Sequence, residues 1–295
     1  MKKLQFIQRN HERHWVGDGF PVRSVFSYND IAKEMSPFLL LDYAGPEIFP
    51  AARSVAADSK DQPRRGVGEH PHRGFETVTI VYDGQVEHRD SSGGGGVIGP
   101  GDVQWMTAAS GLVHDEFHGA DFARDGGRFE MIQLWVNLPA RDKSAAPGYQ
   151  SISSAQIPSV ALADDAGTAR VIAGELEGAR GPARTFTPVN LWDLKVRAGH
   201  RAELRVPDGH TASLFVLKGR IRLPSGEQAG EAELAVLERA GDRVSFEALE
   251  DSTLLFLGGE PIHEPIAAYG PFVMNYPGEI RQAMIDFQEG RMGRL

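Results

Sequence analysis

The chain has 295 residues, of which 41% are hydrophobic and 24% are charged, and these proportions exclude a disordered or fibrous protein. Asp and Glu outnumber Lys and Arg by 40 to 31, so the net charge of −9 disfavours direct binding of nucleic acid. The count of cysteine is 0, which excludes disulfides, thiolate metal sites and cysteine nucleophiles. A transition metal in this chain would need His, Asp or Glu ligands.

The first residues lack the pattern of a targeting segment. Lys2 and Lys3 are followed by apolar residues that alternate with Gln, Arg and Asn, not by a continuous apolar core. No stretch approaches the roughly 18 consecutive apolar residues that a membrane crossing needs. We therefore expect a cytoplasmic protein without membrane association, and we expect a monomer.

Short apolar runs separated by glycine and proline predict an all-β protein. The strand-like runs of the first half are Phe75–Tyr82, Gln85–Ser91, Val97–Ala108 and Arg128–Leu138. Asp83-Gly84 predicts a tight turn between the first two runs. The segment Pro139–Val160 is rich in Pro, Ser, Ala and charged residues, which indicates a connection between two domains.

The second half repeats this rhythm. Its strand-like runs are Arg170–Leu176, Val189–Gly199, Arg201–Pro207, Ala212–Leu223, Ala232–Ala248 and Ser252–Pro261. Leu214–Leu223 resembles the run that turns at Asp83-Gly84, and Leu237–Phe246 resembles the run that contains Gly101-Asp102, which indicates an internal duplication. Pro277–Gly293 changes to a helical period. The residues therefore predict an all-β sandwich or barrel, with one β-barrel unit duplicated along the chain and a short C-terminal helix.

The pattern that indicates chemistry lies in EHPHRGFE (Glu69–Glu76) and SGLVHDEFH (Ser110–His118). Residues i and i+2 of a strand point the same way. His70 and His72 therefore lie on the same face of their strand, and His114 and Glu116 lie on the same face of theirs. If the two segments are neighbouring strands, all four side chains meet around one ion. The alternative is that both pairs are ordinary, partly exposed residues. We favour a metal site because the same spacing occurs twice in a chain with 10 histidines.

Three imidazoles and one carboxylate suit Fe(II), Mn(II), Co(II), Ni(II), Cu(II) or Zn(II). Four protein ligands leave up to about two octahedral positions for water, substrate or dioxygen, and such openness distinguishes a catalytic site from a closed structural one. The residues alone leave the identity of the ion open.

Several further residues are candidates with a weaker signal. Glu76 is expected to point inward as a fifth ligand, as an acceptor that fixes a histidine tautomer, or as a carboxylate paired with Arg73, and we favour the acceptor. His88 and Asp90 are expected to form local hydrogen bonds. The remaining candidates are His118 as a lesser ligand, His11 and His14 as surface residues, and Phe75, Trp105, Met106 and Phe117 as lining of an apolar pocket or as core.

Three segments of this chain resemble the pirin family of bicupins. They are HPHRGFETVTIVYDGQVEHRDS (His70–Ser91), GVIGPGDVQWMTAASGLVHDE (Gly96–Glu116) and YGPFVMN (Tyr269–Asn275). HWVGDGFPVRSVFS near the start and EIRQAMIDFQEGRMG near the end are also similar to that family. The resemblance covers nearly the whole chain, and the run from His70 to Glu116 is its most specific part.

The resemblance implies two tandem cupin (jelly-roll-like) β-barrels, which we place at residues 1–142 and 143–295, with the C-terminal helix in the second. The family's ligand pattern falls on His70, His72, His114 and Glu116, and the ion it suggests is Fe(II). The second half has no His-x-His pair between the connection and Leu254, so we expect its barrel to bind no metal.

The activity that the resemblance implies is that of a quercetin 2,3-dioxygenase, with a phenolic or flavonol substrate and O2. Glu116 is the expected catalytic base, which takes the proton of the substrate's 3-hydroxyl. The alternative, also implied by the family, is a metal-dependent regulatory or adaptor protein that binds a protein partner and uses the ion as a redox switch.

Overall fold

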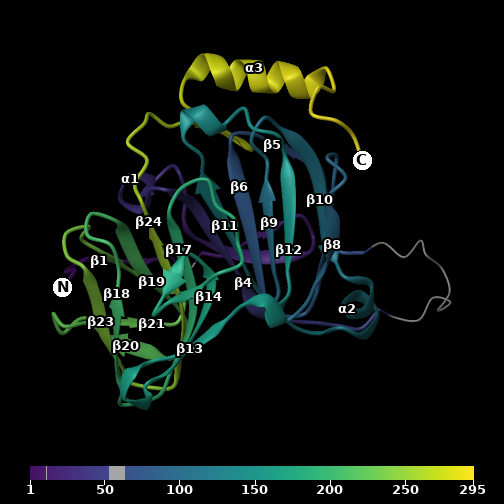
Figure 1. The fold of residues 1–295 in the computed structure, drawn as a ribbon. Helices are drawn as coiled ribbons and strands as arrows, with labels where there is room; N and C mark the ends of the chain where they lie inside the picture. Colours follow the sequence, from purple (N-terminus) through teal and green to yellow (C-terminus); the bar gives the residue numbers. More distant parts are fainter. Residues whose placement is uncertain (11, 53–63) are drawn as a thin grey trace. The chain divides into compact units, whose positions relative to one another are not determined.

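The computed structural model describes residues 1–10, 12–52 and 64–295. The chain forms two compact units, which we name by their barrels (Figure 1). The first barrel contains the segments Glu12–Ser24, Leu41–Ser154 and Glu264–Leu295, and the second barrel contains Met1–His11, Val25–Leu40 and Ala155–His263. The described part of the chain is mostly β-strand, as the sequence predicts.

The first barrel is built from two antiparallel sheets. Its seven-stranded sheet has the order β12 (Gly148–Ile152), β9 (Val103–Thr107), β6 (Phe75–Asp83), β11 (Gly127–Asn137), β4 (Phe38–Phe49), β3 (Phe20–Phe26) and β2 (His14–Val16). Its four-stranded sheet has the order β5 (Gly66–His72), β10 (Leu112–His118), β7 (Val86–Asp90) and β8 (Gly95–Ile98). The helical segments are α2 (Ala120–Asp125) and η1 (Ala140–Asp142).

The C-terminal segment also packs on the first barrel. It forms the hairpin of β25 (Ala267–Tyr269) and β26 (Phe272–Met274), followed by α3 (Pro277–Gln288). Of the apolar residues of α3, Ile280 and Ala283 are buried and cluster with Phe272 and with Val113 of β10. Met284, Ile285 and Phe287 are exposed, so only a narrow face of the helix packs on the barrel.

The second barrel has the same two-sheet construction. Its larger sheet has the order β1 (Leu4–Arg9), β22 (Glu233–Leu237), β19 (Thr211–Lys218), β24 (Ser252–Gly259), β17 (Val189–Val196), β14 (Gly167–Ala173) and β13 (Ser159–Ala161). Its smaller sheet has the order β18 (Arg201–Arg205), β23 (Arg243–Ala248), β20 (Arg220–Arg222) and β21 (Gln228–Gly230). The remaining elements are α1 (Ala32–Met35), η2 (Ser154–Gln156), η3 (Ala163–Asp165) and the hairpin of β15 (Glu175–Leu176) and β16 (Ala179–Arg180).

The internal duplication is visible in the strand order. Strands β18, β23, β20 and β21 follow one another in the second barrel as β5, β10, β7 and β8 do in the first. One detail of the predicted repeat is wrong: Gly241-Asp242 precedes β23, whose counterpart is β10, whereas Gly101-Asp102 precedes β9. The two Gly-Asp pairs are therefore unrelated turns, because the same dipeptide suits many turns.

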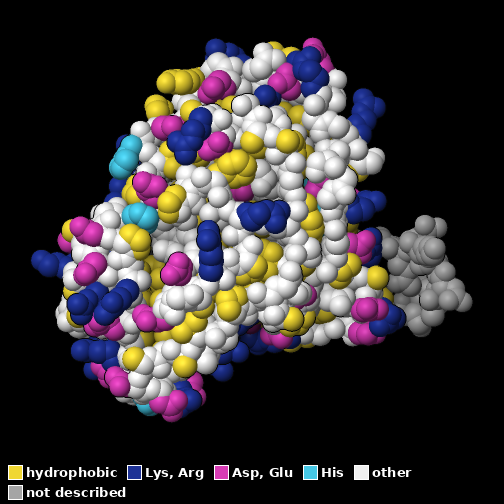
Figure 2. Space-filling view, viewed as in Figure 1, with side chains coloured by type: hydrophobic (Ala, Val, Ile, Leu, Met, Phe, Trp, Pro, Cys, Tyr) yellow, Lys and Arg dark blue, Asp and Glu magenta, His cyan; other side chains and the backbone are white. Residues whose placement is uncertain are grey.

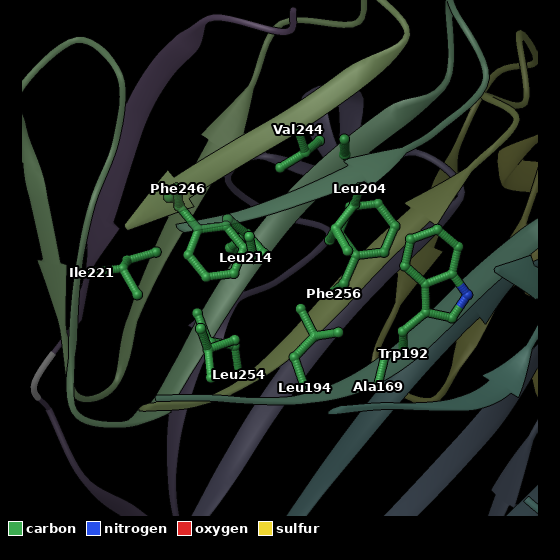
Figure 3. Close-up of a cluster of buried hydrophobic side chains, with 14 of the residues drawn as sticks. Ala169, Trp192, Leu194, Leu204, Leu214, Ile221, Val244, Phe246, Leu254 and Phe256 are labelled. Atoms are coloured by element: carbon green, nitrogen blue, oxygen red, sulfur yellow. The ribbon is translucent and has the colours of Figure 1, made fainter. Parts of the chain in front are cut away.

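The interior of the second barrel is filled with apolar side chains (Figure 3). Strands β18 and β23 correspond to the histidine-bearing strands β5 and β10. They contribute Ala202, Leu204, Val244 and Phe246 to this core. Trp192 stacks on Phe256 with ring centroids 4.5 Å apart in the same cluster. This packing gives a physical reason for the expectation that the second barrel binds no metal, which stays a prediction.

The predicted division at residues 142 and 143 differs from the observed one in four segments, which are Met1–His11, Val25–Leu40, residues 143–154 and Glu264–Leu295. β1 pairs with β22 and so belongs to the second barrel, while α3 packs on the first. The expected connection Pro139–Val160 contains β12, which pairs with β9 of the first barrel. These placements depend on contacts between residues far apart in sequence, which local composition does not encode.

On the face drawn in Figure 2, Lys and Arg side chains are scattered among Asp and Glu side chains. Among the residues that the structure describes, none of the helices has both the length and the apolar character that a bilayer crossing requires.

Candidate metal centre

Strands β5 and β10 bring three histidines together. The strands pair antiparallel with His114 opposite His70 and Leu112 opposite His72. The ring centroid of His114 lies 4.1 Å from that of His70 and 4.7 Å from that of His72. One ring nitrogen of each histidine lies within 4.8 Å of those of the other two. The predicted convergence of His70, His72 and His114 is therefore what the structure shows.

Burial sets the environment of two of these imidazoles, His72 and His114. His72 and His114 are buried, and His70 is half-buried. Burial, reinforced by the neighbouring histidines, holds the pKa of His72 and of His114 well below the usual value. Nδ1 of His72 and Nε2 of His114 are buried, and neither has a hydrogen-bond partner within residues 1–10, 12–52 and 64–295. Buried polar atoms normally have partners, so this cluster fits a bound cation, which would satisfy the free lone pairs.

Glu116 lies beside this cluster and is held by amide groups. A β-bulge separates it from His114 in the pairing with β5. One oxygen, Oε1, accepts a hydrogen bond of 2.6 Å from Nε2 of Gln104, and the other, Oε2, accepts one of 2.8 Å from Nε2 of Gln133. The carboxylate forms a second group of candidate ligands with His114 and His88 within 4.8 Å. Glu116 thus lies next to His114, one member of the three-histidine cluster.

Tyr149 fixes the amide that holds Glu116. Its hydroxyl donates to Oε1 of Gln104 over 3.3 Å, so the amide nitrogen of Gln104 faces the carboxylate. Burial, together with Glu116 and Asp90, raises the pKa of Tyr149, which keeps the hydroxyl proton in place. Tyr149 lies on β12, inside the segment that composition marks as a connection, and sequence reasoning missed it.

Glu76 does not point toward the histidines, contrary to the expectation. On β6, Phe75 contacts the ring of His72 and Thr79 contacts Glu116, so odd-numbered side chains face the cluster. Glu76 lies on the opposite face, where it accepts a hydrogen bond of 2.8 Å from the hydroxyl of Thr107. Arg73, the other expected partner, pairs with Asp286 instead.

Burial raises the pKa of Glu76 to about 7, although the hydrogen bond from Thr107 acts in the opposite direction. An acid whose folded-state pKa is raised contributes stability below its unfolded pKa and loses it as pH rises through the folded value. Between about pH 4.5 and 7 we expect the wild type to lose ~3 kcal/mol of unfolding free energy relative to Glu76→Gln, which mimics the protonated acid. Denaturant titrations of both proteins at pH 4 and pH 8, on either side of both pKa values, measure this difference, and parallel pH profiles would refute it.

The other candidates divide between the cluster and the core. His88 and Asp90 hydrogen-bond to each other as expected, but Nδ1 of His88 also lies 3.2 Å from Nδ1 of His114. Of the four proposed pocket residues, Phe75 contacts His72, at 5.1 Å between ring centroids. Trp135, which sequence reasoning missed, stacks on Phe75 and contacts His72 as well.

The remaining candidates lie outside the cluster. His118 is surrounded by phenylalanine rings and hydrogen-bonds to the carbonyl of Gly19. It therefore lies away from the three histidines, although its spacing in the strand is that of His114 and Glu116. His14 is exposed, as expected, while His11 lies outside the described residues. The other three proposed pocket residues lie elsewhere. Trp105 is on the same face of β9 as Thr107, and Met106 is in a buried apolar cluster. Phe117 lies beneath the guanidinium of Arg64.

Two family models match most of the chain, and a known protein matches its whole length. Residues 19–136 match the family model described as Pirin, and residues 191–293 match that of the Pirin C-terminal cupin domain. A Pseudomonas aeruginosa protein, provisionally named a quercetin 2,3-dioxygenase, is 55% identical over 294 residues, which covers 100% of this chain and 99% of the relative. A pirin-like protein of Caulobacter vibrioides is 40% identical over 262 residues, 88% of each chain.

Solved structures agree with these matches. The crystal structure of a quercetin 2,3-dioxygenase from Acinetobacter baumannii superposes with a TM-score of 0.94 at 49% identity, and the match covers 99% of each chain. The two-sheet barrels described above are thus cupin domains, the first of which carries the histidine cluster. On these grounds the chain belongs to the pirin family.

Proposed function

We propose that this protein is a metal-dependent dioxygenase of the quercetin 2,3-dioxygenase type, with its centre in the first barrel. The observation that carries the proposal is the convergence of His70, His72 and His114 beside Glu116, with buried ring nitrogens that have no partner in the part of the chain that the structure describes. The names of the relatives from Pseudomonas aeruginosa and Acinetobacter baumannii support the flavonol substrate and the use of O2.

In this proposal the three histidines and Glu116 hold one divalent ion. Fe(II) is the ion we propose, and Mn(II), Co(II), Ni(II), Cu(II) and Zn(II) suit the same ligands. A bound ion supplies Lewis acidity, which lowers the pKa of a hydroxyl group that it contacts. His72 and His114 are buried, so these ligands are kept from bulk water, while the half-buried His70 forms the more accessible side of the cluster.

Glu116 is the residue we propose to move the proton. Its two oxygens accept hydrogen bonds from Gln104 and Gln133. Glu116 is the acceptor in both bonds, so neither bond requires a proton on the carboxylate. The carboxylate is therefore held as an acceptor, which is the state a base requires to take the proton of a flavonol 3-hydroxyl. The two amides also fix its orientation, so that little reorganisation is needed before proton transfer.

Oxygen uptake tests the activity directly. The full chain is loaded with Fe(II) under argon, mixed with quercetin and then exposed to air. We expect one O2 to disappear for each flavonol lost, and we expect no uptake from chelator-treated protein. Loss of neither O2 nor quercetin from protein shown to contain iron would contradict the proposal and favour the regulatory alternative.

A further inference from the structure

His88 and Asp90 are buried beside the cluster, and the proposed chemistry gives them no role. Nε2 of His88 lies 3.0 Å from Oδ2 of Asp90, and Nδ1 of His88 lies 3.2 Å from Nδ1 of His114. The exposed fractions of His88 and Asp90 are 1% and 5%. The three side chains therefore form one buried chain of hydrogen bonds that runs from a carboxylate to a candidate metal ligand.

The other side of Asp90 is tied to its own turn. Oδ1 accepts the backbone N–H of Ser92 at 2.8 Å, the backbone N–H of Gly94 at 3.0 Å and the hydroxyl of Ser92 at 2.5 Å. Burial alone would raise the pKa of Asp90, but these hydrogen bonds and the one from His88 together lower it to about 2. Asp90 is thus an ionised acceptor whose Oδ2 faces His88.

The direction of each hydrogen bond follows from this end of the chain. An ionised carboxylate only accepts, so Nε2 of His88 donates the hydrogen. If His88 carries a single hydrogen, that hydrogen is on Nε2, its Nδ1 has a lone pair, and Nδ1 of His114 must donate to it. The lone pair of His114 is thereby placed on Nε2, the buried nitrogen that has no partner among the described residues.

We propose that Asp90 and His88 are positioning residues that hold His114 in the tautomer able to bind the ion, an inference that rests on the proposed metal site. The ring of His88 is itself fixed, because it stacks on Tyr149 at 4.9 Å with an interplanar angle of 12°. Carboxylates and histidines behind a metal ligand orient it and raise its basicity, and their loss typically costs about 10- to 100-fold in metal affinity.

Asp90→Asn is the sharpest test, because the turn dictates how the new amide is oriented. The two N–H groups and the hydroxyl at Oδ1 require an oxygen there, so the amide NH2 faces Nε2 of His88. His88 must then accept at Nε2 and carry its proton on Nδ1. That proton forces His114 to accept at Nδ1 and places its hydrogen on Nε2, where it blocks a metal.

Two measurements detect this change in the tautomer of His114. In metal-free protein, long-range ¹H–¹⁵N NMR spectra of the imidazoles report the tautomer of His114, and we expect Nδ1–H in the wild type and Nε2–H in Asp90→Asn. In chelator competition under argon with Fe(II) alone, we expect Asp90→Asn to bind about 10- to 100-fold more weakly than the wild type. His88→Phe keeps a ring against Tyr149 but removes both nitrogens, and we expect a similar loss of affinity.

Asp102→Asn is the matched control, since Asp102 is another turn carboxylate of the first barrel, which accepts the backbone N–H groups of Gly99 and Ser154. We expect it to leave the tautomer and the affinity unchanged. An unchanged His114 tautomer in Asp90→Asn, or an Fe(II) affinity within about twofold of the wild type, overturns the inference. If the wild type itself binds no iron, the proposed function fails, while the NMR spectra still decide the hydrogen-bond chain.

Discussion

Replacement of His114 by alanine is expected to abolish tight metal binding and, with it, oxygen uptake. His114 is 0% exposed and is the one residue common to both groups of candidate ligands. Loss of an outer partner of a ligand costs about 10- to 100-fold in affinity, so removal of the ligand itself should cost more than about 100-fold. Elemental analysis of the purified protein and chelator competition measure the loss.

His200→Ala is a matched control for this substitution. His200 is on the second barrel, where its Nδ1 contacts the carbonyl of Ala198 at 3.1 Å. We expect this variant to keep the metal content and the activity of the wild type. Circular dichroism shows whether His114→Ala stays folded, and a folded His114→Ala protein with full metal content would contradict its assignment as a ligand.

Glu116→Gln is expected to keep most of the metal and to lose turnover. The three histidines remain, and the new amide oxygen still accepts from Gln104, whose orientation Tyr149 fixes. The amide has no basicity near neutral pH, so the proton of the 3-hydroxyl loses its acceptor. General-base catalysis contributes about 10²- to 10⁴-fold, and we expect kcat to fall within that range.

The measurement for Glu116→Gln is oxygen uptake normalised to bound iron. Glu247→Gln, which changes a half-buried glutamate paired with Arg222 on the second barrel, should leave both quantities unchanged. A Glu116→Gln protein that turns over at the wild-type rate would show that the proton goes elsewhere. A protein that loses its iron would show that Glu116 acts mainly as a ligand.

The three-histidine cluster was predictable because it depends on alternation within single strands. His70 and His72 lie on β5, and His114 lies on the strand paired with it, so counting by two places all three on one side. The same count fails for Glu76, since β5 ends at His72 and β6 begins at Phe75 in another sheet. Gly74, with φ of 91°, makes the turn between them, and alternation does not carry across a turn.

The contact of His88 and Asp90 with the histidine cluster could not be predicted from the sequence, although their spacing was visible in it. They are a third polar pair with i, i+2 spacing, in the same sheet as the other two pairs. Their spacing gave the signal, but the contact with His114 depends on the pairing of β7 with β10. In the same way, β1 and α3 went to unexpected barrels because long-range pairing decides where a terminal segment packs.

Anomalous diffraction from crystals of the iron-loaded protein would locate the ion and identify its element together. We expect one peak at the iron edge, about 2 Å from a ring nitrogen of each of His70, His72 and His114 and near Glu116. A peak ligated by His88 and Glu116 without His70 and His72, or no peak in the first barrel, would contradict this expectation.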